Sequence, residues 1–192
     1  MSKILGNLNT AILIGVLLLV SAMVVFHGDQ FGGAYLAPWF VFFHVISGVL
    51  WIGLLYYFNL VQIPTMPKVP AELKPGVSKY IAPEALFWFR WAAIATLLTG
   101  LIVAHLKGYL IEALTFQDGF KVIGFGMYVG MVMAFNVWVF IWPNQKKALG
   151  IVDATPEAKA AAATTAMMFS RTNFILSMPM LYAMVTQMYL AV

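Results

Sequence analysis

The sequence contains no cysteine. Without thiols the chain forms no disulfide, offers no thiolate to a metal, and cannot hold a haem covalently through a C-x-x-C-H motif. Charged residues are also scarce, at 9% of 192, whereas about a quarter of the residues in soluble proteins are charged. The net charge is +4, but no lysine- or arginine-rich run is present. The sequence therefore excludes thiol chemistry and a soluble domain, and it predicts no nucleic-acid partner.

Apolar residues take the place of charge. They make up 62% of the chain, and the mean hydropathy is +0.89. A soluble protein of this length could not bury that much apolar surface, so the composition predicts an integral membrane protein in contact with a lipid bilayer. No internal repeat, low-complexity tract or soluble segment interrupts the sequence. Residues 1–192 are accordingly expected to form a single transmembrane helical domain.

The apolar runs predict an all-α bundle, because a helix needs about 20 apolar residues to cross the hydrocarbon core. We expect five transmembrane helices, at about 9–26, 38–63, 83–105, 121–142 and 160–190. Pro83 suits the first turn of the third helix, and Pro143 is expected to end the fourth. The first apolar run is too long for a signal peptide and no small-residue cleavage site follows it, so we expect it to be retained.

The lysines predict the orientation of the bundle, since cytoplasmic loops are rich in lysine and arginine. Lys107 and Lys121 fall on one side of the predicted spans. The lysines on the other side, which also carries the N-terminus, are Lys3, Lys68, Lys74, Lys79, Lys146, Lys147 and Lys159. This bias predicts a multi-pass protein with its N-terminus in the cytoplasm and its C-terminus outside.

Histidine is confined to the predicted outer half of the bundle. His27 and His105 end the first and third helices, and His44 lies about 10 Å below the outer end of the second. Neutral imidazole is a good ligand for haem iron and other metals. One hypothesis is that His44 and a second histidine hold a b-type haem, with Ser47 and Gly48 leaving room beside it. The alternative is that His44 bonds to a carbonyl or hydroxyl across the bundle.

A second group of polar residues lies in the predicted inner half. It consists of Asn59, Arg90, Asn136, Arg171 and Asn173, which are the candidate ligand-binding residues. No acid within a span neutralises the arginines, so an anion from outside the chain would suit them: a lipid phosphate, a haem propionate or a substrate. Snorkelling to the membrane surface is the alternative.

Two features of the predicted fourth helix concern helix contacts. Asn136 is expected to form a hydrogen bond across helices. Gly126 and Gly130 form a G-x-x-x-G pattern, which permits close contact between helices, either inside one chain or in a homo-oligomer.

Several stretches carry a family resemblance. They are "WIGLLYYFNLVQ" (51–62), "PEALFWFRWAA" (83–93), "MAFNVWVFIWPNQKKALG" (133–150) and "SRTNFILSMPMLY" (170–182). Together they resemble the membrane domain of bacterial membrane-bound urate hydroxylases, the urate-oxidase N-terminal family. In that family a multi-helix membrane domain precedes a c-type cytochrome, and urate is thought to be oxidised with electrons passing to the cytochrome. The 192 residues include no cytochrome and fewer expected helices, so we expect a stand-alone short form.

The resemblance gives the two polar groups a combined interpretation. The inner residues would hold a planar, hydrogen-bonding molecule such as a purine, and the outer histidines a haem that passes electrons to a cytochrome c or a larger membrane complex. The resemblance implies a multi-pass redox protein of a bacterial inner membrane, an electron-transfer or oxidoreductase subunit. The alternative is a non-catalytic accessory or assembly subunit of a larger oxidase or respiratory complex. Whether the chain is itself an enzyme stays open at this point.

Overall fold

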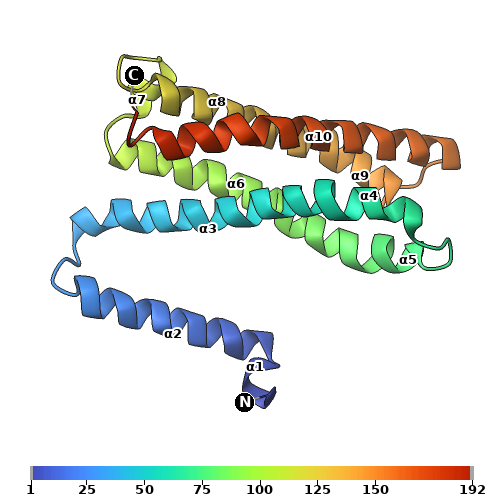
Figure 1. The fold of residues 1–192 in the computed structure, drawn as a ribbon, viewed down its shortest axis with the longest axis horizontal. Helices are drawn as coiled ribbons and strands as arrows, with labels where there is room; N and C mark the ends of the chain where they lie inside the picture. The colour runs from blue at the N-terminus through green and yellow to red at the C-terminus, as the bar shows by residue number, and fades with distance from the viewer. Residues whose placement is uncertain (1, 191–192) are drawn as a thin grey trace. The chain divides into compact units, whose positions relative to one another are not determined.

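The computed structural model describes residues 2–190, and every regular element in that range is helical (Figure 1). The all-α prediction is therefore confirmed. The long helices are α2 (Leu8–His27), α3 (Leu36–Tyr56), α6 (Ala82–Leu106), α8 (Lys121–Phe135) and α10 (Pro156–Thr186). The short ones are α1 (Ser2–Leu5), η1 (Gly33–Tyr35), α4 (Ile63–Thr65), η3 (Met66–Lys68), α5 (Lys74–Gly76), α7 (Leu110–Leu114) and α9 (Trp142–Ala148). Three π-helical segments complete the chain: η2 (Tyr57–Gln62), η4 (Val77–Ile81) and η5 (Asn136–Ile141).

Four continuous helical stretches within residues 2–190 are long and apolar enough to cross a membrane. They are Leu8–His27, Leu36–Lys68, Lys74–Leu106 and Lys121–Ala148. The membrane prediction is thus supported by the length and composition of these helices. A 33-residue helix such as Lys74–Leu106 is about 50 Å long, whereas the hydrocarbon core is about 30 Å thick. Such a helix extends beyond the apolar layer.

The chain folds as two compact units, Met1–Trp39 and Phe40–Val192, here called the N-terminal unit and the bundle. In the N-terminal unit, α2 begins at a cap in which Asn7 Oδ1 accepts a hydrogen bond from the backbone N–H of Thr10, at 3.2 Å. None of the residues of α2 is buried. A helix that is apolar on all sides and has no buried residue is suited to lipid rather than water.

The helices of the bundle extend past three prolines, where sequence reasoning expected them to begin or end. The helix that contains α8 continues through Pro143 to Ala148, so the expectation that Pro143 ends it was wrong. Pro64, Pro83 and Pro143 each come two residues after a π-helical segment. A proline ring clashes with the carbonyl four residues earlier and lacks an N–H group. A wider π turn just before the ring relieves this clash, and the helix continues.

The core of the bundle lies between α3, α6, α8, η5 and α10. Its largest fully buried side chains include Trp51, Leu55, Phe89 and Met133. α10 packs most extensively against α8, and it also packs against η5 and α9. Gly126 is buried, and a Cβ at this position would lie 2.9 Å from Cβ of Ala183 on α10. Gly126 therefore serves a close contact inside the chain, whereas a Cβ at Gly130 would meet no atom within 4 Å.

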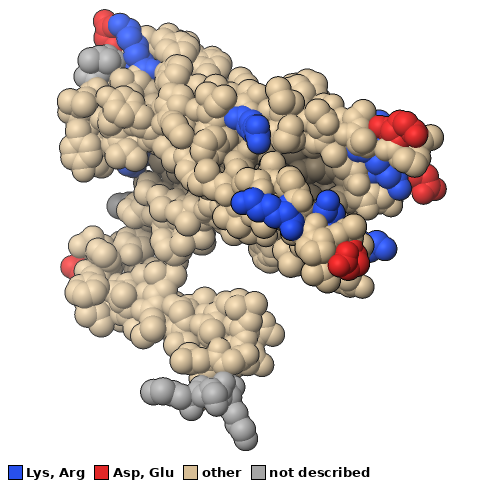
Figure 2. All heavy atoms as spheres, turned by 45° about the vertical axis from the view of Figure 1, so that its right-hand side comes forward, with Lys and Arg blue, Asp and Glu red and all other residues tan. Residues whose placement is uncertain are grey.

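The two ends of the bundle differ in their number of lysines. One end, here called the α9 end, carries the loops that follow α4 and α9 and the start of α10 (Figure 1). The other, the α7 end, carries α7 and the end of α10. Lys146, Lys147 and Lys159 belong to the α9 end, whereas Lys107 and Lys121 belong to the α7 end. Most of the surface in Figure 2 carries no charged side chain, as expected for a protein in lipid.

Candidate functional site

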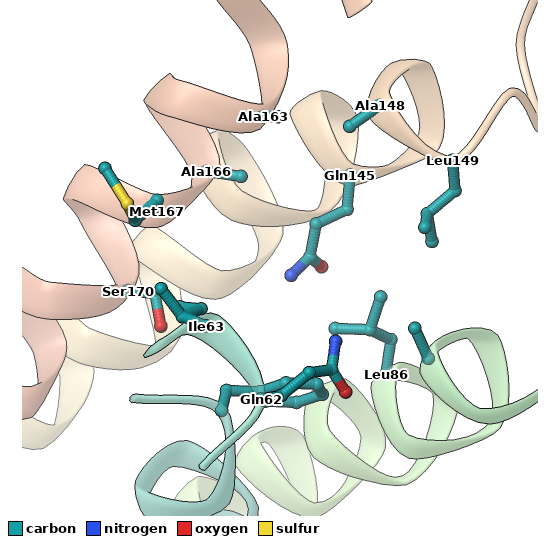
Figure 3. Close-up of a pocket in the computed structure, with 12 residues that line it drawn as sticks. Gln62, Ile63, Leu86, Gln145, Ala148, Leu149, Ala163, Ala166, Met167 and Ser170 are labelled. Carbon is teal, nitrogen blue, oxygen red and sulfur yellow. The ribbon is translucent and has the colours of Figure 1, made fainter. Parts of the chain in front are cut away.

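A cavity of about 160 Å³ opens among four helical stretches at the α9 end of the bundle (Figure 3). Its lining residues come from η2 and α4, the start of α6, the end of α9 with the residue that follows it, and α10: Phe58, Gln62, Ile63, Ala82, Leu86, Gln145, Ala148, Leu149, Ala163, Ala166, Met167 and Ser170. An engineered apolar cavity of about 150 Å³ holds benzene, so this volume suits a small planar molecule. No charged side chain lines the cavity.

Amide side chains supply most of the polarity of the cavity. Figure 3 shows Gln145 and Gln62 extending into it from different helices. Oε1 of Gln62 is buried and has no hydrogen-bond partner among the described residues. A buried, unpaired amide oxygen costs about 1–3 kcal/mol, and a ligand or an ordered water with an N–H or O–H group removes that cost. The cavity is therefore equipped to accept hydrogen bonds.

Asn59 lies next to this cavity on η2 and contacts one of its lining residues. Its Nδ2 donates hydrogen bonds of 2.9 Å to the carbonyl of Leu55 and to Oγ of Ser170. Because a carbonyl can only accept, the orientation of this amide is fixed, and its Oδ1 is the acceptor. That oxygen is also buried without a partner. Asn59 and Gln62 therefore leave two unpaired acceptors within one π-helical segment, a distortion that often occurs at functional sites.

The two buried asparagines of the core form a closed pair. Nδ2 of Asn136 donates to Oδ1 of Asn173 at 2.9 Å, and Nδ2 of Asn173 donates to the carbonyl of Met133 at 2.9 Å. Asn173 is fully buried. The prediction that Asn136 bonds across helices is confirmed. Because these hydrogen bonds join Asn173 to Asn136 and Met133, they hold α8 and η5 against α10. They leave few free hydrogen-bonding groups for a ligand.

The arginines lie in different surroundings. Arg90 on α6 stacks its guanidinium over Trp142, with Cζ 3.9 Å from the ring centroid, and its carbonyl accepts a hydrogen bond of 3.3 Å from Nε1 of Trp138. Arg171 is exposed on α10. None of the five residues predicted to bind a ligand lines the cavity, although Asn59 contacts Ser170, which does.

His44 is held against α6. Its Nδ1 lies 2.9 Å from the carbonyl of Thr96, so Nδ1 carries the proton and donates. A Cβ at Gly100 would lie 2.8 Å from Cε1 of His44, and a Cβ at Gly48 would lie 3.8 Å from Cγ2 of Thr96. The room left by the small residues is thus occupied by a neighbouring helix. This contact is the one expected under the alternative hypothesis, in which His44 bonds to a carbonyl across the bundle.

The other two histidines are exposed. His105 is in the last turn of α6, five residues beyond Gly100. That separation corresponds to about 7.5 Å along the helix and about 140° around it, so the two positions face different directions. His27 belongs to the N-terminal unit, where its ring centroid lies 5.8 Å from that of Tyr35. Within residues 2–190 no three His, Cys, Asp or Glu side chains gather as a metal site. The haem hypothesis stays a prediction.

Comparisons with protein-family models, curated proteins and solved structures gave no match.

Sequence reasoning selected neither Gln145 nor Ser170. Gln145 follows Pro143, where the helix was expected to have ended, and Ser170 was one small residue in an alanine-rich segment. A signal was nevertheless present. Gln62 and Gln145 each lie two residues from a proline, at the lysine-rich ends of two apolar runs. Amides are rare within spans, so two of them in corresponding positions indicate a shared polar site.

Proposed function

We propose that this chain is the membrane-embedded, ligand-binding subunit of a bacterial inner-membrane oxidoreductase resembling the membrane domain of membrane-bound urate hydroxylase. The observation that carries the proposal is the amide-lined cavity at the α9 end. It combines the volume for a small planar molecule with the buried, unpaired Oε1 of Gln62. Amides recognise planar molecules that carry N–H and C=O groups side by side, as purines do. Electrons would leave through a cytochrome c or a larger membrane complex.

The proposal includes a topology of five spans, with the N-terminus in the cytoplasm and the C-terminus outside. α10 is not among the helices that are long and apolar enough on their own, since the polar residues 170–173 interrupt its apolar run. Its buried residues nevertheless run from Ala162 to Ala183, along α8, η5 and α9. A helix packed along a spanning helix for about 30 Å crosses the membrane with it. The lysines of the α9 end support an orientation in which that end, and the cavity, face the cytoplasm.

Binding of urate by purified protein in lipid nanodiscs tests the proposed function. Calorimetric titration of the wild type is expected to show saturable binding. Gln62→Leu should weaken it about tenfold, since one hydrogen bond to a buried amide contributes about 1–1.5 kcal/mol. Gln117→Leu is the matched control, because Gln117 is exposed at the α7 end.

Two results would count against the function. One is a wild type that binds neither urate nor the less acidic purine xanthine. The other is a Gln62→Leu variant that binds as tightly as the wild type. Either result leaves the accessory or assembly subunit as the better account, with the helices serving as contact surfaces for a larger complex.

A second candidate function is haem binding by His44, and one observation favours it. With Nδ1–H donating to the carbonyl of Thr96, the neutral imidazole keeps its lone pair on Nε2, which has no hydrogen-bond partner among the described residues. A backbone carbonyl bound to one ring nitrogen is the usual support for a histidine that ligates a metal through the other. His27 or His105 would supply the second axial ligand. Haem would add a one-electron carrier to the subunit.

A further inference from the structure

Two positive charges from different helices share one tryptophan ring at the α9 end. Cζ of Arg90 on α6 lies 3.9 Å from the ring centroid of Trp142, and Nζ of Lys146 on α9 lies 5.7 Å from it. Phe87 also lies under the guanidinium, with its centroid 5.2 Å from Cζ. Sequence reasoning paired Arg90 with Arg171. The structure instead brings Arg90 together with Lys146.

Neither of these cations is neutralised by a carboxylate of the described chain. Within residues 2–190 the salt bridge that forms joins Lys121 to Asp118, at the α7 end. Glu84, the acidic residue of α6, accepts a hydrogen bond of 3.0 Å from Nε1 of Trp88. Two like charges on one partly buried ring repel each other, and the repulsion is stronger where bilayer lowers the dielectric constant. An anion from outside the chain would relieve it.

The surroundings indicate what that anion is. Trp88 and Trp91 flank Arg90 in the sequence, and each is 50% exposed. Exposed tryptophans on a membrane helix mark the level of the lipid head groups. Arg90 and Trp142 are only partly buried, so the charged group is accessible from the lipid. At that depth the abundant anion is the phosphodiester of a phospholipid. Basic pockets between helices bind such head groups.

We propose that Arg90, Lys146 and Trp142 form a binding site for the phosphate of an anionic phospholipid at the α9 end of the bundle. The guanidinium provides paired donors to phosphate oxygens, and the ammonium provides a second charge. Trp142 holds the side chains of Arg90 and Lys146 in place through cation–π contacts with its ring. The site is separate from the amide-lined cavity, whose lining residues include none of these three. It does not depend on the proposed function.

Native mass spectrometry of protein released from nanodiscs tests the site. The discs contain phosphatidylglycerol and phosphatidylcholine in equal amounts, and the retained lipids are counted. Arg90→Gln and Lys146→Gln should each lower retained phosphatidylglycerol about fivefold, and the double variant should lower it further. Lys147→Gln is the matched control, because Lys147 is the exposed neighbour of Lys146 and contacts no ring. Arg90→Lys, which keeps the charge, should retain more lipid than Arg90→Gln.

Several results would overturn the site. Equal loss of phosphatidylglycerol in the Lys146 and Lys147 variants would mean a diffuse surface charge. Equal retention of phosphatidylcholine by the wild type would mean that the lipid charge is not recognised. Displacement of the lipid by millimolar inorganic phosphate would identify free phosphate as the ligand. Circular dichroism of each variant, expected to match the wild type, separates loss of the site from loss of the fold.

Discussion

His44 shows how one hydrogen bond serves two interpretations. The bond to the carbonyl of Thr96 fixes the imidazole against α6, and Gly100 allows the close approach. A purely structural histidine needs no more than this. A ligating histidine needs the same bond, because the bond selects the tautomer that leaves Nε2 free. Only the presence or absence of a bound group distinguishes the two.

Replacement of His44 by leucine tests the haem candidate. Leucine fills a similar volume and suits lipid, so the variant should still insert. If His44 is an axial ligand, the absorption of reduced b-type haem should be lost from the visible spectrum of His44→Leu. The same replacement at His27 and His105 separately should identify the second ligand. A wild type that lacks haem and metal by spectrum and elemental analysis, or a variant that keeps them, makes His44 a packing residue.

At the scale of single residues, the sequence predicted which side chains need a polar partner better than it predicted which residue that partner is. The need of a buried amide for a partner is local, so the cross-helix bond of Asn136 could be expected from its place in an apolar run. Which partner each cation finds depends on helix rotation. Lys146 looked like a solvated lysine, yet the helix continues past Pro143 and carries Lys146 to the ring that Arg90 contacts.

At the scale of elements, the π-helical segments explain the main differences from the expected boundaries. A proline predicts a helix end if the helix stays α-helical. Here the turn widens before Pro64, Pro83 and Pro143, and each helix continues. Pro179 lies inside α10 without such a segment, so proline alone does not dictate the widening. The pattern of apolar residues does not reveal the wider turn. A π-helical turn contains one additional residue, which rotates the rest of the helix without changing its composition.

The contact between α8 and α10 gives a prediction at the same scale. A side chain at Gly126 would meet Cβ of Ala183 at 2.9 Å, so Gly126→Leu should force the two helices apart. Overpacking of this kind costs about 1–3 kcal/mol, and the melting temperature in detergent, followed by circular dichroism, should fall by about 5 °C.

Gly53→Leu is the matched control for this variant. Gly53 is an exposed glycine of α3, and a Cβ added there would meet no atom within 4 Å. Its replacement should leave the melting temperature unchanged. Melting of Gly126→Leu at the wild-type temperature, with a change in oligomeric state instead, would assign the glycine pattern to contact between chains.

At the scale of the whole molecule, composition alone predicted the membrane class and the all-helical fold, because the shortage of charge and the long apolar runs leave few alternatives. The fifth span was expected from an apolar run like the others, and it stays a prediction. It depends on packing, since α10 shows its buried face only against α8 and α9. The cavity at the α9 end arises from four helical stretches at once, so no single stretch of sequence indicates its volume.

The topology can be tested without background labelling, because the chain has no native cysteine. Single cysteines at Lys147, Gln117 and Tyr189 should react differently with a membrane-impermeant maleimide applied to intact cells. We expect labelling of Gln117→Cys and Tyr189→Cys from outside, and labelling of Lys147→Cys only after the cells are opened. Labelling of Lys147→Cys in intact cells would reverse the orientation. Protection of Tyr189→Cys together with labelling of Gln117→Cys would show that α10 does not cross the membrane.

The buried face of α10 has a consequence for assembly. Most of its members are small: Ala162, Ala166, Ser170, Ser177 and Ala183 accompany only two longer side chains, Asn173 and Met180. Alanine has no rotamers to lose on burial, and serine has few. Of the long helices described, α10 leaves the ribosome after the others, and its docking demands little side-chain ordering. It can pack against helices already in the bilayer through close contact between backbones and the hydrogen bond between Asn136 and Asn173.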